Sequence, residues 1–258
     1  MATNTSSLSV EQIGAKLKHP ERVVGFHFFN PVAVMPLIEV VKTPHTNDET
    51  LSTAMVTAKN LRKNAVITTD TPGFVVNRIL AKVLGEAMHA VDTGTPFEVV
   101  EESTRPFGLP MTPFELLELV GLKVGAHVLD THHAAFPDRF FESKNLHKLA
   151  ELGYIFERDS KGKSKGVSKK AVEIVKGGNS PMTAEELQIR IEDGLADEIH
   201  RMLEDGVVAA AEDIDLCLIL GAGYPFQMGG VTPYLDRAGA SERAFGSTFH
   251  DPRIRGVQ

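Results

Sequence analysis

The sequence has little cysteine, no excess of positive charge and no long apolar run. Cys217 is the single cysteine in 258 residues, which excludes an internal disulfide and a paired-cysteine metal or redox site. The 27 Lys and Arg against 34 Asp and Glu give a net charge of −7, so we expect no nucleic-acid partner. No run approaches the roughly 20 apolar residues of a membrane span, and the N-terminus does not resemble a signal peptide. We therefore predict a cytoplasmic protein without a membrane span.

The composition is that of a globular protein. Hydrophobic residues make up 42% of the chain and charged residues 24%, which is enough to bury a core. At roughly 150 residues per domain, the length predicts about two domains.

Short apolar runs alternate with helical patterns at the start of the chain. The runs rich in β-branched and aromatic residues predict strands over Val23–Phe29, Leu37–Lys42 and Ala65–Thr69, and helices are expected over Ser9–Leu17 and from about Asp48 to Leu61. Because the strands are apolar on both faces and alternate with helices, they favour a parallel sheet.

After Thr71-Pro72-Gly73 the pattern becomes helical. Apolar residues recur at helical spacing over Asn77–Val91, and Phe97–Thr104 and Pro113–Leu129 predict further helices. A Lys-, Gly- and Ser-rich stretch within residues 157–182 predicts a solvated linker.

Two stretches of the helical part are repeated. EAMHAVDTG (Glu86–Gly94) is echoed by EIHRMLEDG (Glu198–Gly206). FGLPMTPFELLELVG (Phe107–Gly121) is likewise echoed by GAGYPFQMGGVTPYLDRAG (Gly221–Gly239). The shared Gly and Pro positions favour two copies of one helical unit over chance similarity.

His27 and Glu39 are the polar residues least expected where they stand. Each interrupts an apolar strand, and a carboxylate in such a strand is costly unless it is paired. On successive strands the two satisfy each other most simply as a His–Glu pair, which is the arrangement of an oriented general base. The spacing alone leaves catalysis and a structural pair both open.

Four other polar residues have simpler alternatives. Ser6 stands where the first expected strand ends and the chain turns, and Asn77 opens a helical run; either could be a helix cap, although Ser9 is a better cap candidate than Ser6. His132 and His133 lie near Asp130, but no third ligand has suitable spacing, so we expect no metal site.

The segments ATNTSSL, GFHFFNPVAVMPLIEVV and TDTPGFVVNRIL resemble the L-3-hydroxyacyl-CoA dehydrogenase family, and most closely the dehydrogenase portion of multifunctional fatty-acid β-oxidation α subunits. The resemblance implies an α/β fold followed by an all-α part: the C-terminal half of a Rossmann-type NAD-binding domain and two repeated helical units. The expected divisions are 1–70 for the partial Rossmann domain, 71–156 for the first helical unit, 157–182 for the linker and 183–258 for the second unit with a tail.

The resemblance also implies roles for single residues. His27 corresponds to the base that takes the proton of the 3-hydroxyl, and Glu39 to the acid that orients it. Ser6 corresponds to a residue near the substrate oxygen and the nicotinamide, Asn30 to a nicotinamide contact, and Asn77 to a contact of the acyl oxygen. The implied cofactor is NAD, the substrate an acyl-CoA, and a thiolase subunit the implied partner.

The sequence departs from this family in its nucleotide-binding motif. The family binds NAD through a Gly-x-Gly-x-x-Gly turn, whereas Gly221-Ala222-Gly223-Tyr224-Pro225-Phe226 lacks the last glycine. We therefore expect an N-terminally truncated dehydrogenase with an open sheet edge near residues 2–8, inactive alone. Residues 183–245 are expected to pack against 77–130. The alternative is a non-catalytic substrate-binding or assembly module.

Overall fold

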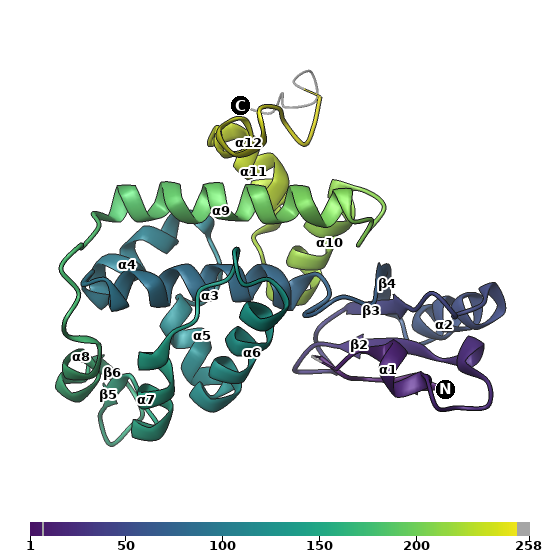
Figure 1. Ribbon diagram of the computed structural model, residues 1–258, viewed down its shortest axis with the longest axis horizontal. Coiled ribbons are helices and arrows are strands. Elements are labelled where there is room, and N and C mark those ends of the chain that lie inside the picture. The colour runs from purple at the N-terminus through teal and green to yellow at the C-terminus, as the bar shows by residue number, and fades with distance from the viewer. Residues whose placement is uncertain (7, 252–258) are drawn as a thin grey trace. The chain divides into compact units, whose positions relative to one another are not determined.

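The computed structural model describes residues 1–6 and 8–251, and the chain forms two compact units (Figure 1). The first unit consists of Met1–Ile79 with Ala196–Gln258, and the second of Leu80–Leu195. The second unit thus begins within one long helix, α3 (Val76–Asp92), and ends within another, α9 (Ala184–Glu204). Residues from Ala196 onward belong to the same unit as the sheet. The domain divisions expected from the sequence placed these residues in the second helical unit instead. Those divisions remain a prediction.

The first unit is built on a sheet of four strands in the order β1 (Ala2–Thr3), β2 (Val24–Phe28), β3 (Leu37–Lys42) and β4 (Asn64–Thr69). Strand β1 is parallel to β2, and β3 is parallel to β4, but β2 and β3 are antiparallel. The expectation of an all-parallel sheet is therefore wrong at its centre. Segment 29–36 is too short for the crossover that a parallel pair requires, so the chain reverses direction there.

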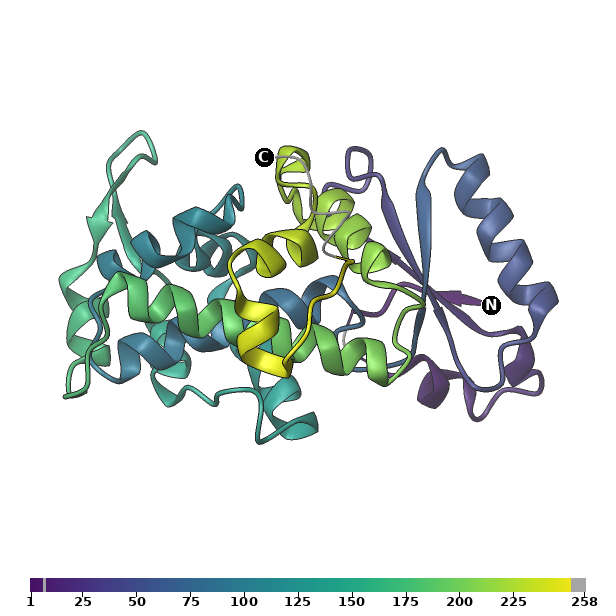
Figure 2. The ribbon, with the colours of Figure 1, turned by 90° about the horizontal axis from the view of Figure 1, so that it is seen from above.

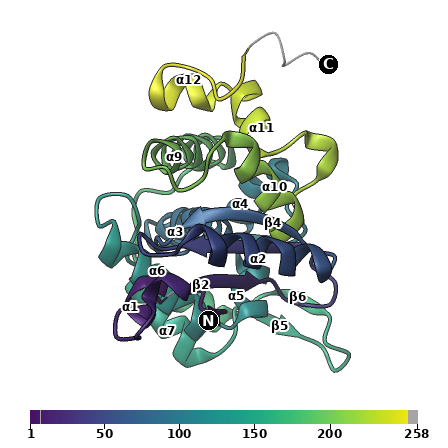
Figure 3. The ribbon, with the colours of Figure 1, turned by 90° about the vertical axis from the view of Figure 1, so that its right-hand side faces the viewer.

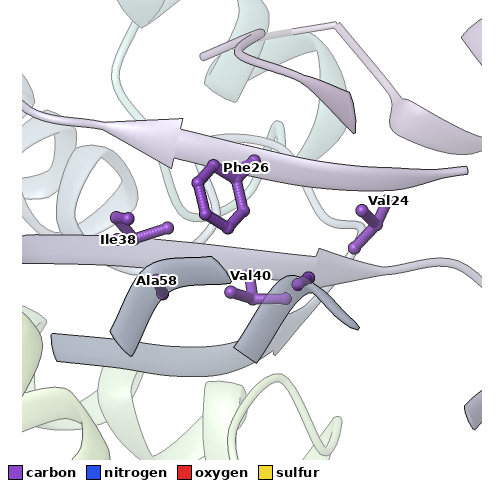
Figure 4. Close-up of a cluster of buried hydrophobic side chains, with 6 residues drawn as sticks. Val24, Phe26, Ile38, Val40 and Ala58 are labelled. Carbon is purple, nitrogen blue, oxygen red and sulfur yellow. The ribbon is translucent and has the colours of Figure 1, made fainter. Parts of the chain in front are cut away.

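The two faces of this sheet are covered by different helices. Helix α2 (Asp48–Asn60) runs along the sheet (Figure 2) and packs on Val24, Phe26, Ile38 and Val40 (Figure 4). On the other face, Val10 of α1 (Val10–Gly14) clusters with Val23, Val41 and Phe74. Because side chains alternate along a strand, His27 and Glu39 share this second face.

Strand β1 forms an edge of the sheet. Among the described residues it pairs with β2 alone, which confirms the expected edge near residues 2–8. An unpaired strand edge is a site at which another chain can add a strand.

The C-terminal part of the first unit contains α10 (Ala211–Ala222), α11 (Val231–Arg237) and α12 (Ala240–Phe245), which follow one another closely (Figure 3). Helix α10 packs against β3 and β4. The backbone N–H of Thr69 at the end of β4 also donates to the carbonyl of Val207, 3.0 Å away. Residues from the end of the chain therefore help to fix the sheet.

The second unit is mainly helical. Besides most of α3 and part of α9, it contains α4 (Phe97–Thr104), α5 (Pro113–Val120), α6 (Leu122–Ala135), α7 (Lys144–Leu152) and α8 (Lys169–Val175). Within residues 1–6 and 8–251, no helix combines the length and apolarity that crossing a membrane requires.

Two segments of this unit differ in structure from what the sequence predicts. The single helix expected over Pro113–Leu129 is divided into α5 and α6 at Gly121, whose φ of 91° is unfavourable for other residues. The expected linker contains a hairpin of β5 (Phe156–Arg158) and β6 (Ser164–Val167), followed by α8. The exposed lysines and glycines of that hairpin produced a composition typical of loops.

Ion pairs connect α3 with α9 inside each unit. In the first unit Arg78 Nε lies 2.5 Å from Glu198 Oε1, and the two side chains are 0% and 1% exposed. In the second unit Arg190 Nε lies 2.6 Å from Glu86 Oε2. The packing expected of residues 183–245 on residues 77–130 is thus seen for α9, whereas α10 packs on β3 and β4.

The buried Arg78–Glu198 pair gives a first prediction. Replacing Glu198→Ala leaves the Arg78 guanidinium buried without its carboxylate, which should lower the free energy of unfolding by about 3–5 kcal/mol. Urea denaturation measures this loss. Glu173→Ala, which breaks the exposed pair with Lys176, serves as the control and should cost about 0–1 kcal/mol. Equal losses of unfolding free energy in the two variants would contradict a stabilising role of the buried Arg78–Glu198 pair.

Candidate active site

The structure brings His27 and Glu39 together as a buried pair. They are register partners on the antiparallel strands β2 and β3, and His27 Nδ1 lies 2.7 Å from Glu39 Oε2. Residue exposure is 5% for His27 and 0% for Glu39. The pairing expected from the sequence is present, and antiparallel register is what places the two side chains face to face.

The second carboxylate oxygen of Glu39 is held by the start of α3. Glu39 Oε1 accepts hydrogen bonds from the backbone N–H groups of Val75 and Val76, at 3.1 and 3.0 Å. Free N–H groups at a helix N-terminus favour negative charge. Glu39 is therefore fixed on one side by a helix and on the other by the imidazole.

A strained turn delivers these two amides to Glu39. Gly73 has a φ of 75° and Phe74 a φ of 49°, and the left-handed region is unfavourable for a bulky side chain by about 1–2 kcal/mol. Phe74 is nevertheless 1% exposed and packs at an angle to the His27 ring, 5.5 Å between ring centroids. In the sequence, Thr71-Pro72-Gly73 indicated the change to a helical pattern, but not that the amides following this turn would bind Glu39.

The imidazole is enclosed by aromatic side chains and has one nitrogen uncommitted. The Phe29 ring meets the His27 ring edge to face at 4.7 Å. With Glu39 ionised, Nδ1 carries the proton that points to the carboxylate, which leaves the Nε2 lone pair to accept a proton. None of the described residues forms a hydrogen bond to Nε2. The pair can act as an oriented general base.

The other predicted site residues lie around the same edge of the sheet. Ser6 and Asn30 are exposed and follow the carboxyl ends of β1 and β2, which are parallel neighbours. Asn4 strengthens that edge, because its Oδ1 accepts from the Phe28 N–H at 2.9 Å. Asn77 is half-buried in the first turn of α3, directly after Val76. The substrate and cofactor roles of Ser6, Asn30 and Asn77 remain predictions.

Neither Asn77 nor Ser6 is a helix cap. Asn77 is the second residue of α3 and not its cap. Ser9, and not Ser6, caps α1: its hydroxyl accepts from Gln12 N at 3.1 Å. Capping therefore does not account for Asn77 or Ser6.

The histidines near Asp130 take part in ordinary hydrogen bonds. His132 Nδ1 bonds to the carbonyl of Val128 and His133 Nδ1 to that of Phe140, both at 2.7 Å. Over the described part of the chain, no group of three His, Cys, Asp or Glu side chains could hold a metal ion.

The helix N-termini beside the sheet are already occupied, so they do not fit the diphosphate of a dinucleotide. The N-terminus of α1 is filled by Asp70, whose carboxylate accepts from Val10 N and Glu11 N. That of α2 is capped by Asn47 and followed by two acids, and that of α3 is filled by Glu39. A diphosphate needs free N–H groups and no adjacent carboxylate, so none of these three N-termini provides such a cradle.

The sheet, the His27–Glu39 pair and the following helices together define the class of protein: an α/β domain with a buried His–Glu pair, followed by a helical part. Residues 1–71 match the family model described as "3-hydroxyacyl-CoA dehydrogenase, NAD binding domain", and residues 73–165 match the "C-terminal domain" of the same enzymes. The chain belongs to the 3-hydroxyacyl-CoA dehydrogenase family, and the cofactor of the matched domain is NAD.

Curated relatives agree with this family. The chain is 36% identical over 262 residues to the fatty acid oxidation complex subunit alpha of Pseudomonas syringae, and 35% identical over 259 residues to that of Acinetobacter baumannii. Each alignment covers 94% of this chain but only 36% of the relative. The chain thus spans about a third of the length of these proteins.

Solved structures show the same fold. The 3-hydroxybutyryl-CoA dehydrogenase of Escherichia coli aligns with a TM-score of 0.70 at 23% identity, over 97% of this chain and 73% of that one. The (S)-3-hydroxybutyryl-CoA dehydrogenase of Ralstonia eutropha aligns with a TM-score of 0.56 at 30% identity, over 65% of this chain and 60% of that one.

The buried carboxylate gives the second prediction. Glu39→Ala removes the acceptor of two backbone amides and of His27 Nδ1, and we expect it to lower the free energy of unfolding by about 2–4 kcal/mol. Glu39→Gln should cost less, because its amide oxygen still accepts from Val75 and Val76. Chemical denaturation measures both. Glu151→Ala at an exposed position should stay within about 0.5 kcal/mol, and an equally small effect of Glu39→Ala would refute the anchoring role.

Proposed function

We propose that this chain carries the acid–base part of an NAD-dependent L-3-hydroxyacyl-CoA dehydrogenase, which oxidises L-3-hydroxyacyl-CoA to 3-oxoacyl-CoA in fatty-acid β-oxidation. The observation that carries the proposal is the 2.7 Å contact between His27 Nδ1 and Glu39 Oε2 within the segment that matches the family. A buried imidazole of fixed orientation suits the removal of a proton from an alcohol near neutral pH.

In this proposal His27 Nε2 accepts the proton of the substrate's 3-hydroxyl as the C3–H bond breaks and the C3–O bond becomes a carbonyl. NAD, when bound, supplies the acceptor for the hydride that leaves C3. Glu39 stabilises the resulting imidazolium by the charge of its carboxylate. The two amides of α3 keep that carboxylate in place, so its orientation does not change when His27 gains the proton.

Three further side chains are proposed to position the reactants. Asn77 would hold the acyl oxygen of the substrate, Ser6 would contact the 3-oxygen and the nicotinamide, and Asn30 would contact the nicotinamide. Their location after the carboxyl ends of β1 and β2 and at the start of α3 supports these roles, since ligands of open α/β sheets bind at that edge.

A separate segment outside these 258 residues is proposed to supply the diphosphate cradle. This proposal is supported by the N-termini of α1, α2 and α3, which are already occupied by side chains of this chain. They also favour the second candidate function, a substrate-binding or assembly module without catalysis of its own. The names of the relatives as subunits of a fatty acid oxidation complex support assembly with a partner, for which we propose a thiolase subunit.

The third prediction concerns the cofactor. The isolated chain should bind NADH no more tightly than about 1 mM, an affinity worth only about 4 kcal/mol, because the diphosphate meets no free helix N-terminus. An equilibrium fluorescence titration with NADH measures the dissociation constant. Micromolar binding by the isolated chain would contradict the absence of a cradle.

The fourth prediction concerns the base. In a full-length dehydrogenase that contains these residues, His27→Gln should reduce the turnover number by about 10²–10⁴-fold, since a positioned general base contributes that much. The melting temperature should change little. His45→Gln, at an exposed histidine of the same unit, should retain activity. Unchanged turnover in His27→Gln would remove the proposed base and favour the non-catalytic module.

A further inference from the structure

A glycine of α10 lies against the residues that flank the His27–Glu39 pair. Gly221 is near the end of α10, and its Cα faces Leu37 of β3, Val76 of α3 and Phe29 after β2. Each of these neighbours adjoins the pair: Phe29 packs on the His27 ring, Val76 donates its N–H to Glu39, and Leu37 is on the same face of β3 as Glu39. All of these residues belong to the first unit.

The space beside Gly221 is too small for a methyl group. A Cβ at this position would lie 2.6 Å from Leu37 Cδ2, 3.0 Å from Val76 Cγ2 and 3.6 Å from Phe29 Cδ2. Glycine lowers the stability of a helix relative to alanine. Its presence here therefore has a reason in packing, and that reason is the close approach of α10 to β3 and α3.

The three neighbours differ in how they could respond to a Cβ. Leu37 Cδ2 is the end of a flexible side chain, although Leu37 is fully buried. Val76 is β-branched and lies in a helix, where its side chain has essentially one favourable rotamer. Displacing Val76 Cγ2 therefore displaces its backbone, and with it the N–H that Glu39 Oε1 accepts at 3.0 Å.

Another residue of α10 supports the same contact. Cys217, one helical turn before Gly221, is 0% exposed. Burial raises the pKa of its thiol well above the usual range, and the nearby charges of Glu39 and Asp213 raise it further. The thiol thus stays neutral, so α10 places no thiolate charge near the Glu39 carboxylate.

We propose that Gly221 is a positioning residue for the acid–base pair: by letting α10 press on Val76, Leu37 and Phe29, it fixes the α3 amides on Glu39 and thereby Glu39 on His27. The C-terminal helix α10, which contains Gly221, thus contributes to a site formed by the first 77 residues. That the pair is catalytic rests on the proposed function. That Gly221 fixes its geometry does not.

The test compares two helical glycines in the 258-residue chain. Gly221→Ala places a methyl group against Val76, whereas in Gly85→Ala the new Cβ meets only Phe141 N, at 3.8 Å. Nitrogen-15 NMR follows the proton on His27 Nδ1, assigned by its loss in His27→Gln, and the Val76 amide proton. In Gly221→Ala both should exchange with water at least about tenfold faster, and in Gly85→Ala within about twofold of the unchanged chain.

A second variant separates local displacement from general loss of structure. Val76→Ala removes Cγ2 and keeps the backbone N–H, so Gly221→Ala combined with Val76→Ala should regain the slow exchange of Val76→Ala alone. This comparison also decides the question if Gly221→Ala alone does not fold. The inference is overturned if folded Gly221→Ala exchanges both protons at the original rate, or if the double variant exchanges them no more slowly than Gly221→Ala. Changed exchange together with an active His27→Gln dehydrogenase would refute the proposed function and leave the positioning role intact.

Discussion

The carboxylate of Glu39 has no exposed surface, and a charge in that position has to be met by hydrogen bonds on all sides. One oxygen accepts a hydrogen bond from His27 Nδ1, and the other accepts hydrogen bonds from the backbone N–H groups of Val75 and Val76. To deliver them, β2 and β3 must be antiparallel and in register, and the turn at Gly73 and Phe74 must adopt left-handed backbone angles. The burial of Glu39 therefore depends on the pairing of β2 with β3, on the left-handed turn at Gly73 and Phe74 and on the amides at the start of α3.

The sequence was sufficient to predict several helices and strands and the His27–Glu39 pair itself. Strand β3 was expected over the residues that form it, and α4 likewise, because their apolar patterns and their Gly and Pro boundaries are local signals. His27 and Glu39 could be paired in advance because each is costly in an apolar strand unless the other satisfies it. The family resemblance added roles for Ser6, Asn30 and Asn77 that residue patterns alone would not have assigned.

The features of the fold and of the site that the sequence did not predict depend mostly on contacts between residues distant in sequence. Nothing local at Val75 indicates that its amide serves Glu39, and nothing local at Gly221 indicates the crowding by Leu37 and Val76. The antiparallel centre of the sheet was missed because the expectation was based on the apolar runs, which carry no information on strand direction, and not on the shortness of segment 29–36, which excludes a parallel crossover. The split at Gly121 was missed because both helices share one continuous apolar pattern, and only the positive φ of the glycine separates them.

Helix α10 also determines when the site can form during synthesis. The ribosome releases Gly221, which packs beside Val76, well over a hundred residues after His27 and Glu39, and the same is true of Glu198, the partner of Arg78. Pairings of such large sequence separation form late, because the intervening chain must first be ordered. The nascent strands therefore lack the contacts of α10 on the Glu39 side of the sheet until the C-terminal helices have been synthesised and have folded back.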